Sequence, residues 1–476
     1  MGEQMAKISD RPGAPTGVVT SAASANDVLP HLQRLMAARR FDADLELLRD
    51  AHGAVSRRAL ARGWLRPDLV VVSSPRGARD ILARDDEHVE RGMTRMSWEL
   101  RRLIGDGLLV VPHHEWLPRR RALQSVFAGQ SIPRFAGNMA EAADQLARRW
   151  DDGAEVDLDA ECRSLTLRAL CRSMLGLEDD GLMAELGCSL RTAVKWAADR
   201  ALRPAHSPHW LPTRRQRQAH AASAALHELA TEMLRACRSD PARPAPLVRA
   251  LMQTADPQTG QPLTDRAICD ELLSCMIAGH QTTSIALTYA LWASGHSREC
   301  QERVAAEVGR LGDRQLTHAD MPRLRYTIAV LHEALRLCPP IRAVERFVMK
   351  DIAVDGHRVE AGTHVVVAIK AIHRDPALWD DPLTFDPDRF SPERSQGRNP
   401  WQYLPFGAGP RACIGDHVAM VEATLALAAI VRRTEIHSLE GYFPVNVGLT
   451  AMVTAPIPAR LRQRNHETPG WPAKLA

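Results

Sequence analysis

The chain has 476 residues, of which 45% are hydrophobic and 25% are charged. These values are typical of a globular protein and exclude disordered, collagen-like and fibrous proteins. The 61 Lys and Arg residues nearly balance 57 Asp and Glu residues, and only 5% of the residues are aromatic. The sequence therefore lacks the basic, aromatic-rich pattern of a nucleic-acid-binding protein.

The nine cysteines are an odd number, and no two of them form a CxxC pair. This distribution argues against a disulfide framework and a tetrahedral zinc site, and it indicates a reducing compartment. The N-terminus has no apolar run of signal-peptide type, and no stretch of about 20 uncharged apolar residues could span a membrane. The sequence predicts a cytoplasmic protein without a membrane span.

The two ends differ from the rest of the chain. Residues 1–25 are rich in Ala, Ser, Gly and Pro without periodicity, and residues 464–476 carry two prolines and no apolar pattern. We expect a loose N-terminal segment and a loose C-terminal tail. Residues 26–463 contain no internal repeat, linker or sharp change of composition, so we expect a single domain over this range.

Helical apolar periodicity dominates the middle of the chain, and strand-like runs are fewer and shorter. In chain order we predict a strand at 69–74, helices at 137–150, 160–176, 215–237 and 265–293, a hairpin at 347–359 about Asp355-Gly356, a strand at 364–369 and a helix at 415–433. The fold class is therefore mainly α with a small β lobe.

The first candidate motif is the run from Trp116 to Arg120, which places an indole and a guanidinium four residues apart on one helical face. Pro118 is tolerated only in the first turn of a helix, so we expect a helix to start close to it. A basic surface helix is the plain alternative.

The predicted helix over 265–293 is about 45 Å long at 1.5 Å per residue and apolar on most faces, so we expect it to be buried. Its middle reads AGHQTT, from Ala278 to Thr283. Glycine and two threonines are poor helix formers, and they favour a local distortion that would open a groove. A small-residue packing seam is the alternative.

Glu333 and Arg336 lie three residues apart on one predicted helix, which Pro339-Pro340 ends. A run from Phe385 to Phe390 that contains Arg389 follows. Taken alone, such a pair is usually a solvated salt bridge that stabilises little.

Cys413 lies in a glycine-rich loop, PWQYLPFGAGPRACIG over 400–415, directly before a predicted helix. Glycine suits a backbone that turns tightly and passes close to a flat ligand. Backbone N–H groups at a helix N-terminus, together with Arg411, would stabilise a thiolate, which can ligate iron. The alternative is a structural cysteine in a glycine-rich turn.

The segment Phe406-x-x-Gly409-x-Arg411-x-Cys413-x-Gly415 resembles the haem-binding loop of the cytochrome P450 family, the haem-thiolate monooxygenases. The three earlier motifs resemble that family's WxxxR, oxygen-binding and ExxR elements. They occur in family order over roughly 116–415. The resemblance implies a cytochrome P450 fold with a long central helix over haem b (iron protoporphyrin IX), in one catalytic domain over 26–463.

The resemblance also implies roles for individual residues. Cys413 would be the axial ligand of the iron, and Phe406 would pack near its sulfur. Thr282 would help to hand protons to dioxygen, with Thr283 beside it. Gln281 stands where the family usually has an acid, and an amide cannot itself deliver a proton. The remaining implied residues are Ala278 and Gly279, which leave room for dioxygen, the propionate partners Trp116, Arg120, Arg346 and Arg411, and the loop-locking network Glu333, Arg336 and Arg389.

The implied activity is reductive activation of O2 and hydroxylation of a lipophilic small molecule such as a fatty acid or terpenoid. Electrons would come from a separate ferredoxin or flavodoxin and its reductase, and the protein is expected to act as a monomer. Three alternatives remain at this point: a peroxygenase or rearrangement catalyst, a non-catalytic haem-dependent binding protein, and an α-rich protein without haem.

Two surfaces are further expectations. A basic face for an acidic redox partner would comprise Arg119, Arg121, Arg432 and Arg433. The resemblance implies pocket walls at the 93–109 loop (Met93, Trp98, Leu108), Trp196, Trp210, Leu272, Met276, 341–344 and 450–452, with Arg342 facing either a substrate carboxylate or a haem propionate.

Overall fold

The computed structural model describes residues 45–46, 49–50, 53–58, 69–84, 87–124, 126–127, 132–202, 207–255, 259–446 and 450–464. The predicted loose ends, 1–25 and the tail beyond Arg464, lie outside the described residues. Arg464 itself continues the fold, because its backbone N–H donates to the carbonyl of Arg433.

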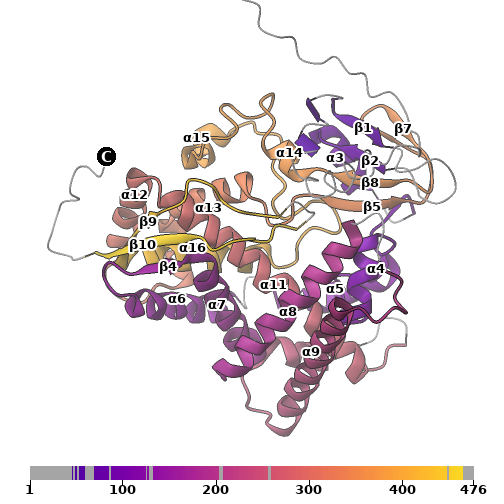
Figure 1. Cartoon of the computed structure of the whole chain (residues 1–476), viewed down its shortest axis with the longest axis horizontal. Coiled ribbons are helices and arrows are strands. Elements are labelled where there is room, and N and C mark those ends of the chain that lie inside the picture. Colours follow the sequence, from indigo (N-terminus) through magenta and orange to yellow (C-terminus); the bar gives the residue numbers. More distant parts are fainter. Residues whose placement is uncertain are drawn as a thin grey trace, which may run out of the picture.

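Helices make up most of the described chain (Figure 1). The α-helices are α3 (Pro75–Leu82), α4 (Arg95–Ile104), α5 (His113–Leu123), α6 (Ile132–Arg149), α7 (Leu158–Leu170), α8 (Asp180–Leu202), α9 (Arg214–Ser239), α10 (Pro246–Met252), α11 (Asp265–Ser294), α12 (Arg298–Gly309), α13 (Arg325–Leu337), α14 (Ile369–His373), α15 (Pro392–Ser395) and α16 (Asp416–Arg433). Short 3-10 or π turns cover Cys171–Leu175, His318–Arg323, Pro387–Phe390 and Pro400–Gln402.

The strands fall into three sheets, and the largest forms a lobe beside the helices (Figure 1). The strands are β1 (Val55–Arg58), β2 (Leu69–Val72), β3 (Val89–Glu90), β4 (Glu155–Asp157), β5 (Val344–Val348), β6 (Ile352–Val354), β7 (His357–Val359), β8 (His364–Val367), β9 (Thr434–Ser438) and β10 (Pro458–Gln463). The five-stranded sheet has the order β1-β2-β8-β5-β3, β4-β10-β9 form a second sheet, and β6-β7 form a ribbon.

The core has two main parts. A large apolar cluster fills the space between the helices, and a smaller one lies in the β lobe around Val70, Val72 and Val367. The mainly α fold with a small β lobe is confirmed. None of the helices in the described ranges is long and apolar enough to cross a membrane.

Local signals explain several element boundaries. Thr264 caps α11, because its side chain accepts the Ala267 N–H, and the helix ends at Gly295. Asp355 and Gly356 have φ of 48° and 82°, as a tight hairpin turn requires. The predicted hairpin therefore forms, but only between β6 and β7, because β5 instead pairs with β8 in the large sheet.

Two local expectations are wrong. Helix α5 starts at His113, so Pro118 lies in its second turn rather than its first. Proline removes one helical hydrogen bond there, and the helix is held instead by its tertiary contacts, such as buried Trp116. Helix α11 is continuous through Ala278 to Thr283, so the small residues do not break it. Space beside this stretch comes from the short side chains themselves.

Candidate functional site: a cavity over the cysteine loop

A cavity of about 380 Å³ lies between α11, α5, β5 and the loop that carries Cys413. Segments that are far apart in the sequence contribute to its wall. Each sequence-predicted catalytic or cofactor residue lines it: Trp116, Arg120, Ala278, Gly279, Gln281, Thr282, Thr283, Arg346, Phe406, Arg411 and Cys413.

The cysteine loop is held in a tight turn. The Cys413 N–H donates to the Phe406 carbonyl at 2.9 Å, and the Gly415 N–H donates to Cys413 Sγ at 3.3 Å. Gly409 has φ of 73°, and a Cβ there would lie 1.8 Å from the Leu82 carbonyl oxygen. Only glycine fits at that position.

The charge state of the Cys413 thiol is a balance of opposing effects. Burial raises its pKa, while the Gly415 N–H and the guanidiniums of Arg120 and Arg91 lower it, and burial dominates. The predicted support for a thiolate therefore comes from Arg120 and Arg91, not Arg411. A metal cation would complete the deprotonation, as it does for coordinating thiols generally.

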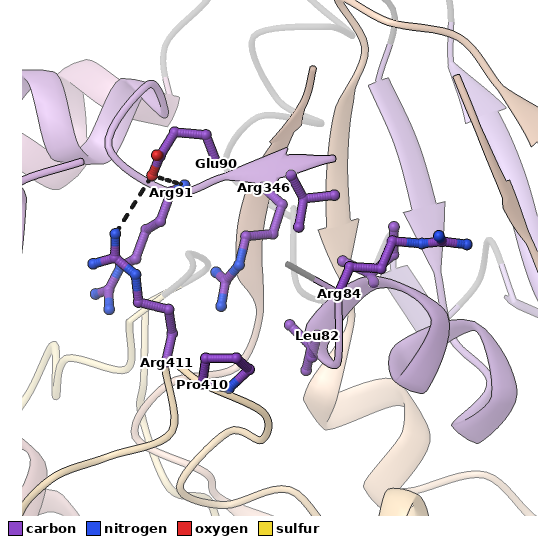
Figure 2. A pocket seen from close by; sticks show the side chains of 9 residues that line it. Leu82, Arg84, Glu90, Arg91, Arg346, Pro410 and Arg411 are labelled. Atoms are coloured by element: carbon purple, nitrogen blue, oxygen red, sulfur yellow. Dashed lines mark hydrogen bonds and ion pairs between the residues drawn. The ribbon is translucent and has the colours of Figure 1, made fainter. Parts of the chain in front are cut away.

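An arginine cluster lies at one side of the cavity, beside a small polar pocket (Figure 2). It comprises Arg91, Arg346 and Arg411, with Glu90 as the carboxylate among them. Glu90 Oε1 lies 3.5 Å from Arg411 Nη2, and the Arg411 guanidinium stacks 4.3 Å over the Trp116 ring. Burial, followed by repulsion from Arg91 and Arg411, lowers the pKa of Arg346 to about 9.

Arg91 and Glu90 are functional candidates that sequence reasoning missed. Neither lies in a recognisable motif, because their neighbours come from β5 and the cysteine loop more than 200 residues away. Glu90 already accepts three backbone N–H groups, from Arg91 at 2.6 Å, Gly92 at 2.8 Å and His113 at 3.0 Å. The cluster therefore retains an excess of positive charge, which suits two carboxylates of a bound group.

The middle of α11 presents small residues to the cavity. The Thr282 hydroxyl donates back to the Ala278 carbonyl at 2.7 Å. His280 points away from the cavity, toward Thr166 of α7 at 3.2 Å, and burial lowers its pKa to about 4.

The cavity wall also contains a buried carboxyl group, that of Glu422 on α16. Burial raises its pKa to about 8, and its Oε1 has no hydrogen-bond partner among the described residues.

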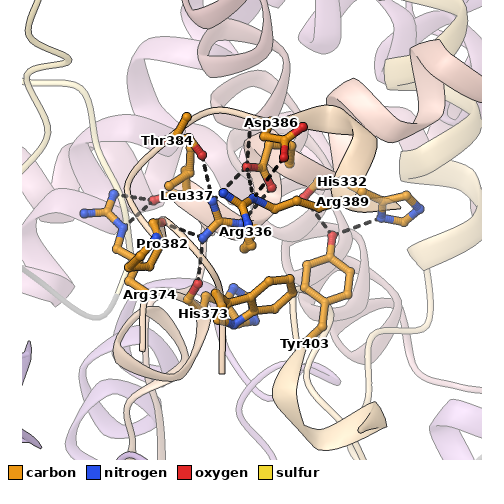
Figure 3. A network of polar contacts seen from close by, with 12 residues as sticks. His332, Arg336, Leu337, His373, Arg374, Pro382, Thr384, Asp386, Arg389 and Tyr403 are labelled. Carbon is orange, nitrogen blue, oxygen red and sulfur yellow. Dashed lines mark hydrogen bonds and ion pairs between the residues drawn. The ribbon is translucent and has the colours of Figure 1, made fainter. Parts of the chain in front are cut away.

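Glu333 and Arg336 form a fully buried bidentate pair, with both bonds at 2.7 Å. Arg389 Nε lies 3.3 Å from Glu333 Oε1. Arg336 also donates to the carbonyls of His373, Pro382 and Thr384 (Figure 3). The alternative of a solvated surface pair is therefore wrong.

This network connects to the cysteine loop through residues that carried no sequence signal. The Leu404 N–H donates to His373 Nε2 at 2.7 Å, and the Tyr403 hydroxyl donates to the His332 carbonyl at 3.0 Å. Both contacts lie directly before Phe406, where the loop begins to turn.

Several expected pocket walls are wrong. Leu272 and Met276 point into the core, and Cys275 and Ile277 line the cavity instead, because neighbouring helical positions differ by about 100°. Met93, Trp98 and Trp210 are largely exposed to solvent, Trp196 packs against His209 and Arg200, and most of the 93–109 loop is helix α4. Leu108, Ile341, Ala343, Val344 and Thr450 do line the cavity.

Two arginine expectations also change. Arg119 is partly buried and pairs with Glu271 at 3.0 Å and Glu115 at 3.2 Å, and Arg432 and Arg433 bind Asp144. Of the four arginines of the expected basic face, Arg121 alone is exposed. Arg342 is buried, donates to the Asn446 carbonyl, and does not line the cavity, so neither of its expected roles applies.

A thiol at a helix N-terminus, an arginine cluster beside it and a helix of small residues across the cavity together fit an iron porphyrin, for which Cys413 would supply the sulfur ligand and the arginines would pair with the propionates. The site and fold define a thiolate-ligated haem protein. The family model described as Cytochrome P450 matches residues 59–460, and the chain belongs to this family.

Named relatives agree with this assignment. Cyclooctatin synthase of Streptomyces melanosporofaciens is 33% identical over 342 residues, covering 71% of this chain and 74% of the relative. Pentalenene oxygenase of Streptomyces avermitilis is 30% identical over 375 residues, covering 78% and 82%. The crystal structure of the cytochrome P450DA heme domain matches with a TM-score of 0.78 and 26% identity, covering 89% of this chain and 93% of that one. The protein is a cytochrome P450 monooxygenase whose cofactor is haem.

Proposed function

We propose that this monooxygenase acts on a neutral terpenoid. The observation that carries the proposal is the separation of charge from apolar surface in the cavity. Its arginines gather at one side of the cavity. Besides Glu422, the wall contains the carboxylate of Glu345, which is paired with His364 at 2.5 Å. The remaining wall is largely aliphatic: Met96, Leu100, Leu108, Leu109, Leu170, Met174, Ile277, Ile341, Ala343 and Val344. Such a wall binds a substrate mainly through apolar burial.

The relatives support this substrate class. Two of them are named cyclooctat-9-en-7-ol 5-monooxygenase and pentalenene oxygenase, which are terpenoid monooxygenases. A terpenoid offers many similar C–H bonds and few polar groups, so the shape of the wall must select the one that reacts.

Haem b supplies the reductive activation of dioxygen when it is bound, using two electrons and two protons for each oxygen atom inserted. Cys413 would ligate the iron, and Phe406 would pack near the sulfur. Trp116, Arg120, Arg346 and Arg411, joined by Arg91, would bind the propionates. Glu333, Arg336 and Arg389 would hold the cysteine loop in place without touching the reacting atoms. The catalytic domain would span residues 26–463.

Protons would reach the cavity through Thr282, with Thr283, Ala278 and Gly279 leaving room beside it. Gln281 can orient water but cannot release a proton. Proton supply to Thr282 would then come through water. Gln281→Glu restores the family's usual acid at this position and should raise the product formed per NAD(P)H. Equal coupling in the wild type and Gln281→Glu would show that this acid is dispensable here.

Electrons would come from a separate ferredoxin or flavodoxin with its reductase, with the enzyme acting as a cytoplasmic monomer. Arg121 is the exposed residue of the expected basic face that can still meet an acidic partner. Arg121→Glu should slow reduction at low ionic strength and leave it unchanged at high ionic strength, because salt screens exposed charges.

The deciding experiment is the absorption spectrum of the reduced protein under carbon monoxide. The wild type should give the red-shifted Soret band of a thiolate-ligated haem, and Cys413→Ala should lose it. Cys275→Ala is the matched control, because Cys275 lines the same cavity and should leave the band in place. Turnover of a terpenoid with the reductase system, compared with hydrogen peroxide alone, then separates the monooxygenase from a peroxygenase. Binding without product in both would indicate a binding protein.

A further inference from the structure

The first half of α11 carries two neighbouring acids that the proposed chemistry does not use. Asp270 is 4% exposed and Glu271 is 1% exposed. Buried carboxylates are costly unless they are hydrogen-bonded, so their partners indicate what they are for. Both face the segment 105–109, which connects α4 to α5.

The two acids bind alternate backbone amides of that segment. The Asp106 N–H donates to Asp270 Oδ2 at 2.9 Å, and the Leu108 N–H donates to Glu271 Oε2 at 2.8 Å. Hydrogen bonds to a charged acceptor are about twice as strong as neutral ones. The segment is therefore attached to α11 at two points, although 163 residues or more of chain separate each pair.

Two glycines let the segment lie flat against the helix. A Cβ at Gly105 would fall 2.1 Å from the Asp270 carboxyl carbon, and a Cβ at Gly107 would fall 2.0 Å from Ser274 Oγ. Gly105 also has φ of 73°, which side chains rarely adopt. The segment can move neither closer to α11, because of this contact, nor away, because of the amide bonds.

The segment forms part of the substrate wall, because Leu108 and Leu109 line the cavity. We propose that Asp270 and Glu271 are positioning residues that fix Leu108 and Leu109 in place and thereby set the size of substrate that the cavity accepts. This inference rests on the proposed function of the cavity.

The two acids differ in what else they hold. Asp270 also binds Arg266 at 2.9 Å and lies 3.4 Å from His227 of α9. Glu271 also binds Arg119 of α5 at 3.0 Å, and the adjacent Arg120 donates to the Ala412 carbonyl in the cysteine loop. Loss of Asp270 should therefore disturb the wall alone, whereas loss of Glu271 should disturb both the wall and the cofactor side.

The test uses Asp270→Ala with Asp270→Asn as the conservative variant, because asparagine keeps one acceptor for the Asp106 N–H. Asp265→Asn is the matched control, since Asp265 lies on the same helix in an exposed pair with Arg238. Gly107→Ala is an independent variant that displaces the wall and leaves both carboxylates in place, because its Cβ would press on Ser274 Oγ and the Asp270 backbone carbonyl. Glu271→Ala removes the carboxylate that pairs with Arg119. If that variant does not fold, Gly107→Ala still tests the proposal.

Two measurements are made on each protein. Spectral titration of the haem-loaded enzyme with imidazole and with clotrimazole, a small and a bulky azole, gives the ratio of their dissociation constants. We expect that ratio to change about tenfold in Asp270→Ala and Gly107→Ala, to return toward the wild-type value in Asp270→Asn, and to stay constant in Asp265→Asn. Hydrogen exchange of apo and loaded protein should show faster exchange of the 106 and 108 amides in Asp270→Ala.

Unchanged exchange at these amides, or faster exchange with an unchanged ratio, would overturn the proposal. Failure of the proposed function looks different, because terpenoids would then give neither a spectral shift nor product in the wild type, while the azole ratio still reports the size of the cavity. The exchange measurement needs no haem and tests the attachment in either case.

Discussion

Two groups of buried arginines flank the cysteine loop, and they are built differently. Arg336 and Arg389 share Glu333, and backbone carbonyls take the remaining Arg336 donors (Figure 3). In the second group Arg411 lies 3.5 Å from Glu90, whose oxygens already accept backbone amides, and Arg91 and Arg346 lie beside this pair (Figure 2). The first group is completed inside the chain, whereas the second keeps excess positive charge at a cavity.

This difference separates a group that holds the fold from a group that waits for a ligand. Arg336, whose donors are all satisfied within the chain, gains little from a further anion. A cluster in which repulsion lowers the pKa of Arg346 to about 9 is stabilised when an anion arrives. Removing a charge should therefore have opposite consequences in the two places.

The largest expected effect is in the completed group. Glu333→Gln leaves Arg336 and Arg389 without their carboxylate in a site that is not accessible to water, which should lower the free energy of unfolding by about 3–5 kcal/mol. Urea denaturation of the apoprotein at neutral pH measures this. A loss below about 1 kcal/mol would mean that the network is not what holds this region.

Glu422 extends the comparison to a buried acid that stays protonated instead of pairing with an arginine. Its folded pKa of about 8 exceeds the ordinary 4.5, so its stabilising contribution is complete below about pH 4.5 and is lost as the pH rises through about 8. Between about pH 5 and pH 9 the wild type should lose on the order of 3 kcal/mol relative to Glu422→Gln. Parallel stability curves for the two proteins would disprove the raised pKa.

Arg346→Gln should reverse the pattern seen for Glu333. Because the folded pKa of Arg346 lies below its ordinary 12.5, the charged side chain costs stability at neutral pH, and the penalty fades only as the pH rises above about 9. The apoprotein variant should be at least as stable as the wild type. Haem transfer to apomyoglobin should be about tenfold faster, since one charge-assisted contact to the cofactor is lost. A destabilised apoprotein would place Arg346 with the completed group.

The smallest effect is expected at the surface. Asp388 pairs with Arg303, and both side chains are more than a third exposed, so solvent screens the interaction. Asp388→Asn should cost at most about 1 kcal/mol and should leave haem transfer unchanged. This variant shows how much of the Glu333 effect depends on burial.

Much of the fold could be predicted from local pattern. The Asp355-Gly356 turn, the buried helix over 265–293 and the strand at 69–74 all appear in the structure, because turn chemistry and apolar periodicity act over a few residues. The same argument failed for Pro118, since α5 begins at His113 and runs through the proline, and buried Trp116 packs this helix against the core. It also failed for Leu272 and Met276, because an apolar helix does not reveal which of its faces meets the cavity.

The candidate site also combines residues that the sequence predicts with residues that it does not. The motif residues could be predicted because each set lies within ten consecutive positions, and the resemblance to a known family then ordered the four sets. Arg119 was wrongly predicted to be exposed, because its partner Glu271 is 152 residues away.

By itself, the sequence determined the protein family, the helical class, the cysteine that would ligate iron and the glycine turn that presents it. Those features depend on short spacings and on backbone preferences that neighbouring residues impose. Only the tertiary structure decided that Arg91 and Glu90 join Arg346 and Arg411 at one pocket, that His373 contacts the cysteine loop, and that Asp270 and Glu271 hold the Leu108 wall. These contacts join segments far apart in the chain, so no local periodicity records them.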